Sequence, residues 1–175
     1  MDSQKLTTAS HLIPAWVDGN LIGVDKLLVH QQGLKHKAVS VFLMCGNQTL
    51  IQKRAADKYH SPCLWANACC THPMLEEPAL ACAIRRLDQE LGISGVTLSP
   101  MTQIEYRAEV GNGMIEHEQV EVFTGDVGAD LQIEPNPDEV MDVQWIDIDD
   151  LKTDAVKSPD AYTEWLKIYL REFAL

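Results

Sequence analysis

Hydrophobic and polar positions alternate along the chain in segments that predict both strands and helices. Residues 37–45 are rich in strand-forming side chains. Residues 49–54 repeat this pattern after a turn at Gly46-Asn47, which predicts a β-hairpin. Residues 55–65 break the alternation with polar and aromatic side chains. The pattern therefore predicts a hairpin that leads into a long loop.

Residues 76–92 have the pattern of an amphipathic helix. Acidic residues followed by Pro78 are typical of a helix start, and Gly92 is typical of a helix end. Arg86 and Glu90 are four residues apart and should share one side of this helix. Large apolar residues recur at helical spacing and predict a buried stripe. The predicted stripe consists of Leu80, Ile84, Leu87 and Leu91.

The clearest alternation of the chain occurs in residues 114–124. A predicted strand at 103–108 and a glycine-rich turn at 111–113 precede it. Side chains two residues apart on a strand share a face, which places Glu116 and Glu118 on the more apolar face of this segment. Buried ions are costly without a partner, so a bound cation would resolve the conflict.

The carboxyl-terminal part predicts one more strand and two helices. Residues 140–146 predict the strand, a short helix should start in 147–151, and a terminal helix should span 160–173. No repeat or linker divides the chain, so we expect an α+β fold with a mixed β-sheet in one domain over residues 1–175. The apolar side of the terminal helix comprises Trp165, Leu166, Tyr169, Leu170 and Phe173.

Composition narrows the function. With 175 residues, 46% of them hydrophobic, the chain can bury one core. A net charge of −12 argues against nucleic acid as a partner, although a few cations in one pocket can still bind a diphosphate. The longest apolar run, at 38–45, is too short to span a bilayer, and residues 1–5 lack a secretory signal. We therefore expect a cytoplasmic protein without a membrane span.

The five cysteines are odd in number and lack the paired spacing of a zinc ribbon, so we expect free thiols. Cys70, two residues from His72, can be a base or nucleophile if a nearby cation lowers its pKa. The alternative for Cys70 is a structural thiol in a tight turn. Cys69 should point the opposite way, and Cys45 and Cys82 should be small buried hydrophobic residues.

Histidines and carboxylates suggest a metal site. His30, His36 and His72, with Glu116 and Glu118, would offer three nitrogen and two carboxylate ligands, a set that suits Zn2+, Mn2+ or a similar ion. No local motif joins these residues. The alternative interpretation is two solvated loop histidines before the first long strand and a charged edge strand.

Two tryptophans also allow two interpretations. Trp65 and Trp165 are residues of a type that usually packs into a core. The face of an indole ring can instead stabilise a carbocation through its quadrupole. The spacing of these residues does not distinguish a packing role from a ligand contact.

Taken in order, these residues resemble the type 1 isopentenyl diphosphate isomerases, a branch of the Nudix superfamily. The resemblance covers roughly residues 26–165, and the interval from His30 to His36 is one residue shorter than in bacterial members. It rests on an ordered set of short motifs rather than on one motif. The set comprises Lys26, His30, His36, Lys53-Arg54, Lys58, Trp65-x-Asn67-x-Cys69-Cys70-Thr71-His72-Pro73, Arg85-Arg86-x3-Glu90-Leu91-Gly92, Tyr106-Arg107-Ala108, Glu116-x-Glu118, Asp138-Glu139-Val140 and Trp165.

The resemblance implies an α/β/α sandwich of the Nudix type and an isomerase of isoprenoid biosynthesis. Members interconvert isopentenyl and dimethylallyl diphosphate by protonation and deprotonation. By this resemblance Cys70 and Glu118 are the catalytic residues, and Tyr106 assists Glu118. The implied substrate is a small isoprenoid diphosphate, and the protein is expected to be a monomer or weak dimer.

The resemblance also implies two metal ions. Glu90, with the main-chain carbonyl of Cys70, would hold Mg2+ together with the substrate diphosphate. Trp165 would face the cationic carbon of the substrate. One Zn2+, Mn2+ or Mg2+ ion would be held by His30, His36, His72, Glu116 and Glu118. The implied phosphate-binding cations are Lys26, Arg54, Lys58 and Arg86.

Two other functions compete with isomerisation. Nudix hydrolases of nucleoside diphosphate derivatives use G-x5-E-x7-R-E-U-x-E-E-x-G-U, in which several carboxylates bind Mg2+. Here Thr71 replaces the first glycine, Arg86 the glutamate of R-E, and Gln89 the first glutamate of E-E. The loss of two carboxylates weakens hydrolysis and suits diphosphate anchoring. A non-catalytic isoprenoid-diphosphate-binding module is disfavoured because Cys70 and Glu118 are both present.

Overall fold

The computed structural model describes residues 12–173, so residues 1–5, where the sequence predicts no secretory signal, lie outside it. The bounds of its elements agree with most of the predicted segments. Within the described range no helix is long and apolar enough to cross a membrane. In chain order the elements are β1 (Leu12–Val17), β2 (Asn20–Asp25), α1 (Lys26–Gln32), β3 (Lys35–Cys45), β4 (Gln48–Arg54), β5 (Trp65–Asn67), β6 (Cys69–Thr71), α2 (Ala79–Leu91), β7 (Ser99–Glu109), β8 (Ile115–Asp126), β9 (Val140–Asp147), α3 (Ile148–Lys157), the 3-10 turn η1 (Pro159–Ala161) and α4 (Glu164–Glu172).

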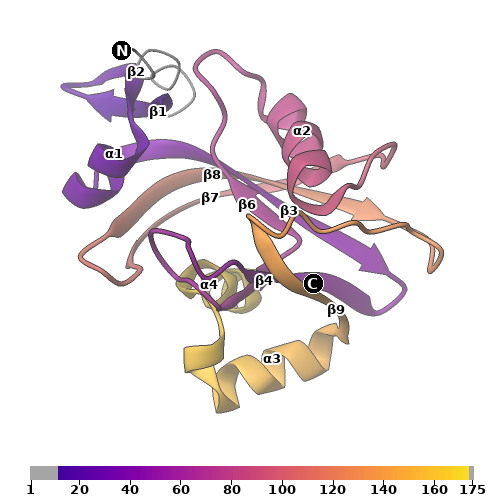
Figure 1. Cartoon of the computed structure of the whole chain (residues 1–175). Helices are drawn as coiled ribbons and strands as arrows, with labels where there is room; N and C mark the ends of the chain where they lie inside the picture. The colour runs from indigo at the N-terminus through magenta and orange to yellow at the C-terminus, as the bar shows by residue number, and fades with distance from the viewer. Residues whose placement is uncertain (1–11, 174–175) are drawn as a thin grey trace, which may run out of the picture.

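The strands of the described range form one mixed sheet with β3 at its centre (Figure 1). β3 and β8 run parallel over ten register pairs, and β7 lies antiparallel on the far side of β8. On its other side β3 pairs with β1, β4 and β6, and all three pairings are antiparallel. The predicted mixed sheet is therefore confirmed.

Both faces of β3 are buried, which explains its nearly continuous apolar sequence. Ala38 and Phe42 belong to the core that contains residues of α4, whereas Val39, Val41 and Leu43 belong to the core that contains residues of α2. Side chains alternate between the faces of a strand, so the sheet has one core on each side. Figure 1 shows α2 on one face and α4 on the other, which confirms the predicted α/β/α layers.

The sheet splits where β3 and β4 separate after two register pairs, Met44 with Thr49 and Cys45 with Gln48. Beyond that point β6 pairs with β3 and β5 pairs with β4. Asn67, at the end of β5, is fully buried and bridges the split. The acceptors of its Nδ2 group are Ser40 Oγ at 2.8 Å, Val41 O at 2.9 Å and Cys69 O at 3.0 Å.

Replacement of Asn67 with alanine should destabilise the fold by about 1–3 kcal/mol, because three buried acceptors on β3 and β6 lose the donor that β5 supplies across the split. The midpoint of denaturant unfolding at unchanged m-value measures this loss. Asn47→Ala is the matched control, since the Asn47 side chain makes one exposed bond to Asp147; it should cost under about 1 kcal/mol. Equal losses in the two variants would contradict this account of Asn67.

The predicted buried stripe of α2 is wrong for half of its residues. Leu87 and Leu91 are buried, but Leu80 is 41% exposed and Ile84 is 46% exposed. The buried side of the helix is shifted from the predicted stripe, so that Cys82, Ala83 and Glu90 face inward together with Leu87 and Leu91. Small residues at 82 and 83 allow the helix to lie close to the sheet, and the inward Glu90 makes polar contacts that a leucine could not make.

The terminal helix begins at Glu164 and not at residue 160. The segment before it is the separate turn η1, and Tyr162 is extended and bridges to Trp65. The amide of Thr163 donates to the carbonyl of Trp65 at 2.9 Å, so tertiary contact with β5 holds this segment out of the helix.

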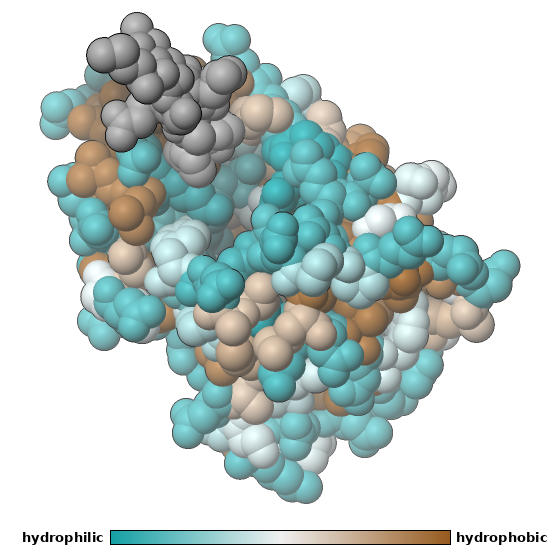
Figure 2. Space-filling view, viewed as in Figure 1, coloured by the Kyte–Doolittle hydropathy of each residue, from teal (hydrophilic) through white to brown (hydrophobic). Residues whose placement is uncertain are grey.

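The amino-terminal part of the described range contains elements that the hydrophobic pattern did not predict. β1 and β2 form a hairpin, and the side chain of Asp25 then caps α1 by accepting from the amide of Leu28 at 3.0 Å. On the face seen in Figure 2, hydrophobic residues gather along the edge formed by α1, where Leu27 and Leu28 are exposed. Hydrophilic residues cover most of the middle of this face.

Candidate metal centre and active site

One pocket, at the place where the sheet splits, brings most of the predicted site residues together. Its walls come from α1, β4, the loop after β4, β6, α2, β8 and α4. Gln52, Tyr59, His60 and Thr71 line it as well, although they were not predicted as site residues. The predicted residues that line it are Lys26, Arg54, Lys58, Cys70, His72, Arg86, Glu90, Glu116, Glu118 and Trp165.

Strand register places two further predicted residues, His36 and Tyr106, beside this pocket. His36 of β3 is the direct register partner of Glu118 of β8, and Glu118 is in turn the partner of Tyr106 of β7. Register partners share a face of the sheet, so these side chains form a row across three strands. Glu116 lies two residues from Glu118 on the same face, and both carboxylates are buried. The alternation predicted for this strand is confirmed.

His30 and His36 are fully buried, so the alternative interpretation as solvated loop residues is wrong. His30 lies in α1, which ends at the left-handed Gly33, and His36 lies in β3. The Nδ1–H of His30 donates to Lys26 O at 2.7 Å, and that of His36 donates to Leu34 O at 2.8 Å. These bonds place the proton on Nδ1 and leave a lone pair on each Nε2, which is the tautomer that a metal ion requires. The hydroxyl of Tyr59 lies 3.4 Å from His30 Nε2.

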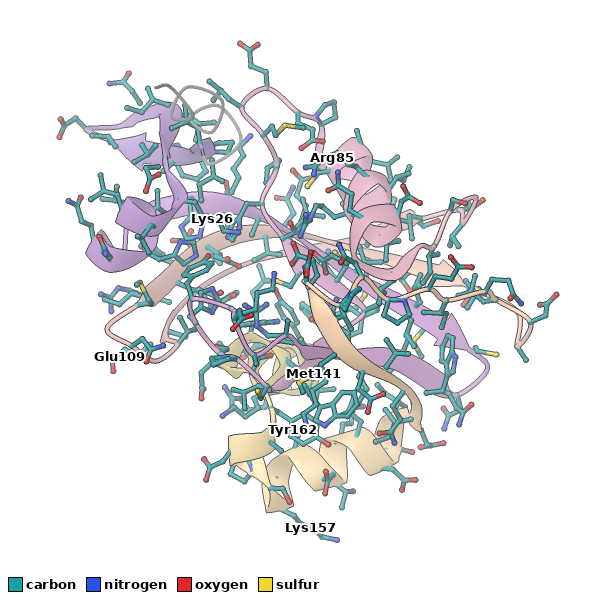
Figure 3. All side chains as sticks on the ribbon, viewed as in Figure 1. Lys26, Arg85, Glu109, Met141, Lys157 and Tyr162 are labelled. Atoms are coloured by element: carbon teal, nitrogen blue, oxygen red, sulfur yellow. The ribbon has the colours of Figure 1, made fainter. Side chains whose placement is uncertain are left out.

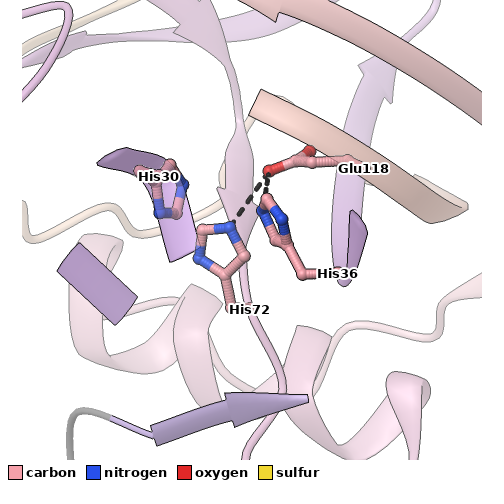
Figure 4. Close-up of side chains that lie close together, drawn as sticks. All are labelled: His30, His36, His72 and Glu118. Atoms are coloured by element: carbon pink, nitrogen blue, oxygen red, sulfur yellow. Dashed lines mark hydrogen bonds and ion pairs between the residues drawn. The ribbon is translucent and has the colours of Figure 1, made fainter. Parts of the chain in front are cut away.

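Four of the predicted ligands converge around one point (Figure 4). Ligand atoms of His30, His36, His72 and Glu118 all lie within 4.8 Å of one another. Glu118 Oε1 lies 3.0 Å from His72 Nε2 and 3.4 Å from His36 Nε2. His36 Nε2 is buried and has no hydrogen-bond partner within the protein. An unpartnered imidazole lone pair beside a buried carboxylate fits a divalent cation.

The fifth predicted ligand, Glu116, falls in a second group. Its carboxylate oxygen lies within 4.8 Å of ligand nitrogens of His30 and His60. The two groups share His30, and their carboxylates, Glu118 and Glu116, lie on the same face of β8. His60 was not predicted because it stands in a polar loop without hydrophobic periodicity. The signal that could have revealed it is its position two residues after Lys58.

The two carboxylates have opposite charge preferences. Burial, followed by the neighbouring charge of Glu118, raises the pKa of Glu116 well above its ordinary value. Burial also opposes the charge on Glu118, but the imidazoles of His36 and His72 outweigh it and hold the pKa of Glu118 well below its ordinary value. The hydroxyl of Tyr106 lies 2.7 Å from Glu116 Oε2 and 2.8 Å from Glu118 Oε2. Glu118 is therefore the more acidic of the two carboxyl groups.

Four cations, Lys26, Arg54, Lys58 and Arg86, line the same pocket, despite the negative charge of the whole protein. Lys26 lies at the start of α1, as labelled in Figure 3, and Arg54 and Lys58 lie at the end of β4 and in the loop that follows. Burial, followed by the charges of nearby cations, lowers the pKa of Lys26 to about 8. Burial also lowers the pKa of Lys58 to about 8. Such a concentration of cations suits an anion with more than one charge.

Hydrogen-bond donors from α2 and β4 hold the carboxylate of Glu90 in the pocket. Arg86 Nη2 donates to Glu90 Oε1 at 2.6 Å, and Gln52 Nε2 donates to Glu90 Oε2 at 2.8 Å. Gln52 also donates to Ala68 O at 2.7 Å, which ties Glu90 to the split of the sheet. This arrangement confirms that Arg86 and Glu90 share one side of α2.

Cys70 and Cys69 point to opposite faces of β6, as predicted. Cys69 is fully buried in the core beneath α2, whereas Cys70 is half-buried and lines the pocket. Cys70 Sγ lies 3.9 Å from the hydroxyl of Tyr169. Burial, followed by the charges of Glu118 and Glu116, raises the pKa of the Cys70 thiol well above its ordinary value. In the free protein this group is therefore a thiol.

The other cysteines follow the prediction with one exception. All five cysteines lie in the described range and are free thiols, and Cys82 is buried. Cys45 is only partly buried because it ends β3 beside the exposed hairpin turn.

Trp165 packs into the core and also lies on the wall of the pocket. Its side chain is almost fully buried in the core beside α4, and it also lines the pocket. The guanidinium carbon of Arg54 lies 5.1 Å from the centre of its ring. Trp65 is half-buried against the same core and does not line the pocket.

Comparison with known proteins agrees with this arrangement. Residues 34–166 match the model of the NUDIX domain. The isopentenyl-diphosphate Delta-isomerase of Dinoroseobacter shibae is 55% identical over 161 residues, which cover 92% of each chain. The isopentenyl-diphosphate Delta-isomerase of Ruegeria pomeroyi is 55% identical over 163 residues, 93% of this chain and 91% of the relative.

Solved structures resemble the fold at low sequence identity. A crystal structure from Deinococcus radiodurans superposes with a TM-score of 0.73 at 15% identity, over 94% of this chain and 99% of that one. The MutT NUDIX hydrolase of Burkholderia pseudomallei superposes with a TM-score of 0.63 at 18% identity, over 80% of this chain and 98% of that one. With its matching domain, its relatives and this fold, the chain belongs to the NUDIX-domain family and, within it, to the isopentenyl-diphosphate Delta-isomerases.

Proposed function

We propose that this protein interconverts isopentenyl diphosphate and dimethylallyl diphosphate by a 1,3-allylic shift of a double bond. The observation that carries the proposal is the pocket itself, in which a thiol and a carboxylate pair lie beside four cations. The identity of at least 50% to relatives named for this activity supports it. The substrate is a small molecule whose diphosphate is an anchor and not a leaving group.

The two catalytic groups project from strands that flank β3. Cys70 lies on β6 and Glu118 on β8, and both strands pair with β3. An unactivated alkene is a weak base, so its protonation needs a positioned acid in a site that excludes water. One group delivers a proton to the alkene, and the other removes a proton from the neighbouring carbon. The direction of the reaction decides which group does which, and the Trp165 ring stabilises the tertiary cation between the two steps.

Two metal ions complete the proposed site. His30, His36, His72, Glu116 and Glu118 would hold one Zn2+, Mn2+ or Mg2+ ion, which supplies a positive charge that increases the acidity of the Glu118–Tyr106 side. Glu90 would hold Mg2+ together with the substrate diphosphate. The diphosphate would be bound by Lys26, Arg54, Lys58 and Arg86.

Incubation of the purified protein with Mg2+ and isopentenyl diphosphate tests the proposal directly. Dimethylallyl diphosphate without free phosphate is the expected result. Release of phosphate would indicate Nudix hydrolysis instead, and the absence of both products would indicate a binding module. Arg86, paired with Glu90, stands where a hydrolase carries a carboxylate, so we expect no phosphate.

The pH dependence of kcat/KM should reveal the titration of the two half-buried lysines, Lys26 and Lys58. Their pKa values of about 8 mean that both are charged below pH 8 and lose their charge above it. A diphosphate binds the charged forms, so kcat/KM should fall above pH 8, by about tenfold per pH unit for each proton required.

Lys26→Arg and Lys58→Arg are the matched variants for this experiment, because a guanidinium stays charged at high pH. The double variant should shift the alkaline fall to higher pH. A profile that is flat up to about pH 10 in the parent protein would contradict this assignment of the lysines.

We also propose a cytoplasmic location and a monomer or weak dimer. The five free thiols support a reducing compartment.

A further inference from the structure

His60 is buried in the centre of the molecule although it belongs to a loop. Its side chain is stacked on His30, with ring centres 5.4 Å apart and an interplanar angle of 23°. It meets Trp165 edge to face at 5.8 Å. The guanidinium of Arg54 holds this turn in place by donating to the carbonyls of His60 and Ser61, each at 3.1 Å. Three side chains and the backbone therefore determine the orientation of this imidazole.

The hydrogen bonds around His60 determine its tautomer. Ser61 Oγ donates its single proton to Val110 O at 3.2 Å, so it can only accept from His60 Nδ1, which lies 3.3 Å away. Nδ1 therefore carries the imidazole proton, and Nε2 has a lone pair. This lone pair lies 3.5 Å from Glu116 Oε1. Two buried acceptors at this distance repel each other unless a proton or a metal ion lies between them.

The same hydrogen-bond pattern, with the proton on Nδ1, occurs at two other histidines of the site. His30 and His36 also donate Nδ1–H to a neighbouring oxygen and direct Nε2 towards the carboxylates. The ligand atoms of His30, His60 and Glu116 lie within 4.8 Å of one another. Only one ring nitrogen of His30, Nε2, has a lone pair, and one lone pair can bind one metal ion. The two groups that share His30 can therefore not hold two ions through it.

We propose that His60 Nε2 is a fourth imidazole ligand of this metal centre and that it binds the ion on the side of Glu116. This inference rests on the metal binding proposed above and adds a ligand to it. The centre would then have His30, His36, His60 and His72 together with the two glutamates, so that protein side chains alone can complete six-coordination.

X-ray absorption at the zinc edge of the full-length, Zn2+-loaded protein counts the coordinated imidazoles. Four imidazoles are expected in the parent protein and three in His60→Ala. The control is His117→Ala, since His117 lies on the opposite face of β8 and contacts Glu105; it should keep four. The Zn2+ dissociation constant, measured by competition with a chelator, should increase at least about tenfold in His60→Ala and remain unchanged in His117→Ala.

A count of three imidazoles in the parent protein overturns the proposal, and that measurement requires no variant. His60→Gln retains most of the side-chain volume and replaces the alanine variant if that one does not fold. Four imidazoles in a protein without isomerase turnover would refute the proposed function while supporting the ligand role of His60.

Discussion

Cys70→Ala should lower kcat for isomerisation by about 10³-fold, because it removes one of the two groups that transfer protons to and from the substrate. The thiol is half-buried in the pocket, and the polar contact that alanine removes is the long one, at 3.9 Å, to the hydroxyl of Tyr169. The cations and the metal ligands stay in place, so substrate affinity and metal content should change little. Steady-state conversion of isopentenyl diphosphate measures kcat, and metal analysis measures the occupancy of the site.

Cys63→Ala is the control for this loss. Cys63 is an exposed free thiol outside the pocket, so its removal should leave kcat within about twofold of the parent value. If Cys70→Ala keeps the parent turnover, Cys70 is a structural thiol, and the proposed mechanism with Cys70 and Glu118 as the two proton-transfer groups is wrong. A parallel loss in both variants would indicate a general effect of thiol removal.

Glu118→Gln should have the second large effect, because it affects metal binding and proton transfer together. The amide has the same shape but no negative charge, so the imidazoles of His36 and His72 lose their anionic partner. We expect the dissociation constant of the metal to increase at least about 100-fold and kcat/KM to fall by about 10³-fold or more. Chelator competition and initial-rate kinetics measure the two effects separately.

Glu121→Gln is the matched control on the same strand. Its side chain points to the other face of β8, away from the row formed by His36, Glu118 and Tyr106. Metal affinity and kcat/KM should stay close to the parent values. Normal metal affinity in Glu118→Gln would exclude this carboxylate as a ligand, and normal turnover would exclude it from catalysis.

The sequence predicted the strands best, because their signal depends on neighbouring residues. The alternation around Glu116 and Glu118 already placed both carboxylates on one apolar face, and the structure buries both. The continuous apolar character of residues 37–45 reflects burial on two faces. Local turn residues such as Gly46 and Gly92 correctly marked the ends of elements.

Elements whose stability depends on distant contacts were predicted less well. α1 is seven residues long and has no amphipathic stripe of its own, so its sequence has little helical signal. Leu80 and Ile84 fit the helical period of α2 no worse than Leu87 and Leu91, yet only Leu87 and Leu91 are buried. Several rotations of one helix can satisfy the same period, and contact with β6 selects among them.

The sequence by itself determined which residues alternate, where the turns lie and which chemical groups are present, because these follow from local backbone geometry and residue type. Only the tertiary structure decided which of those groups meet. His36, Glu118 and Tyr106 become neighbours through strand register, and His60 lies beside Glu116 because Arg54 holds its loop against Trp165 of α4. Convergence of this kind depends on contacts between residues far apart in the chain, and hydrophobic periodicity carries no information about them.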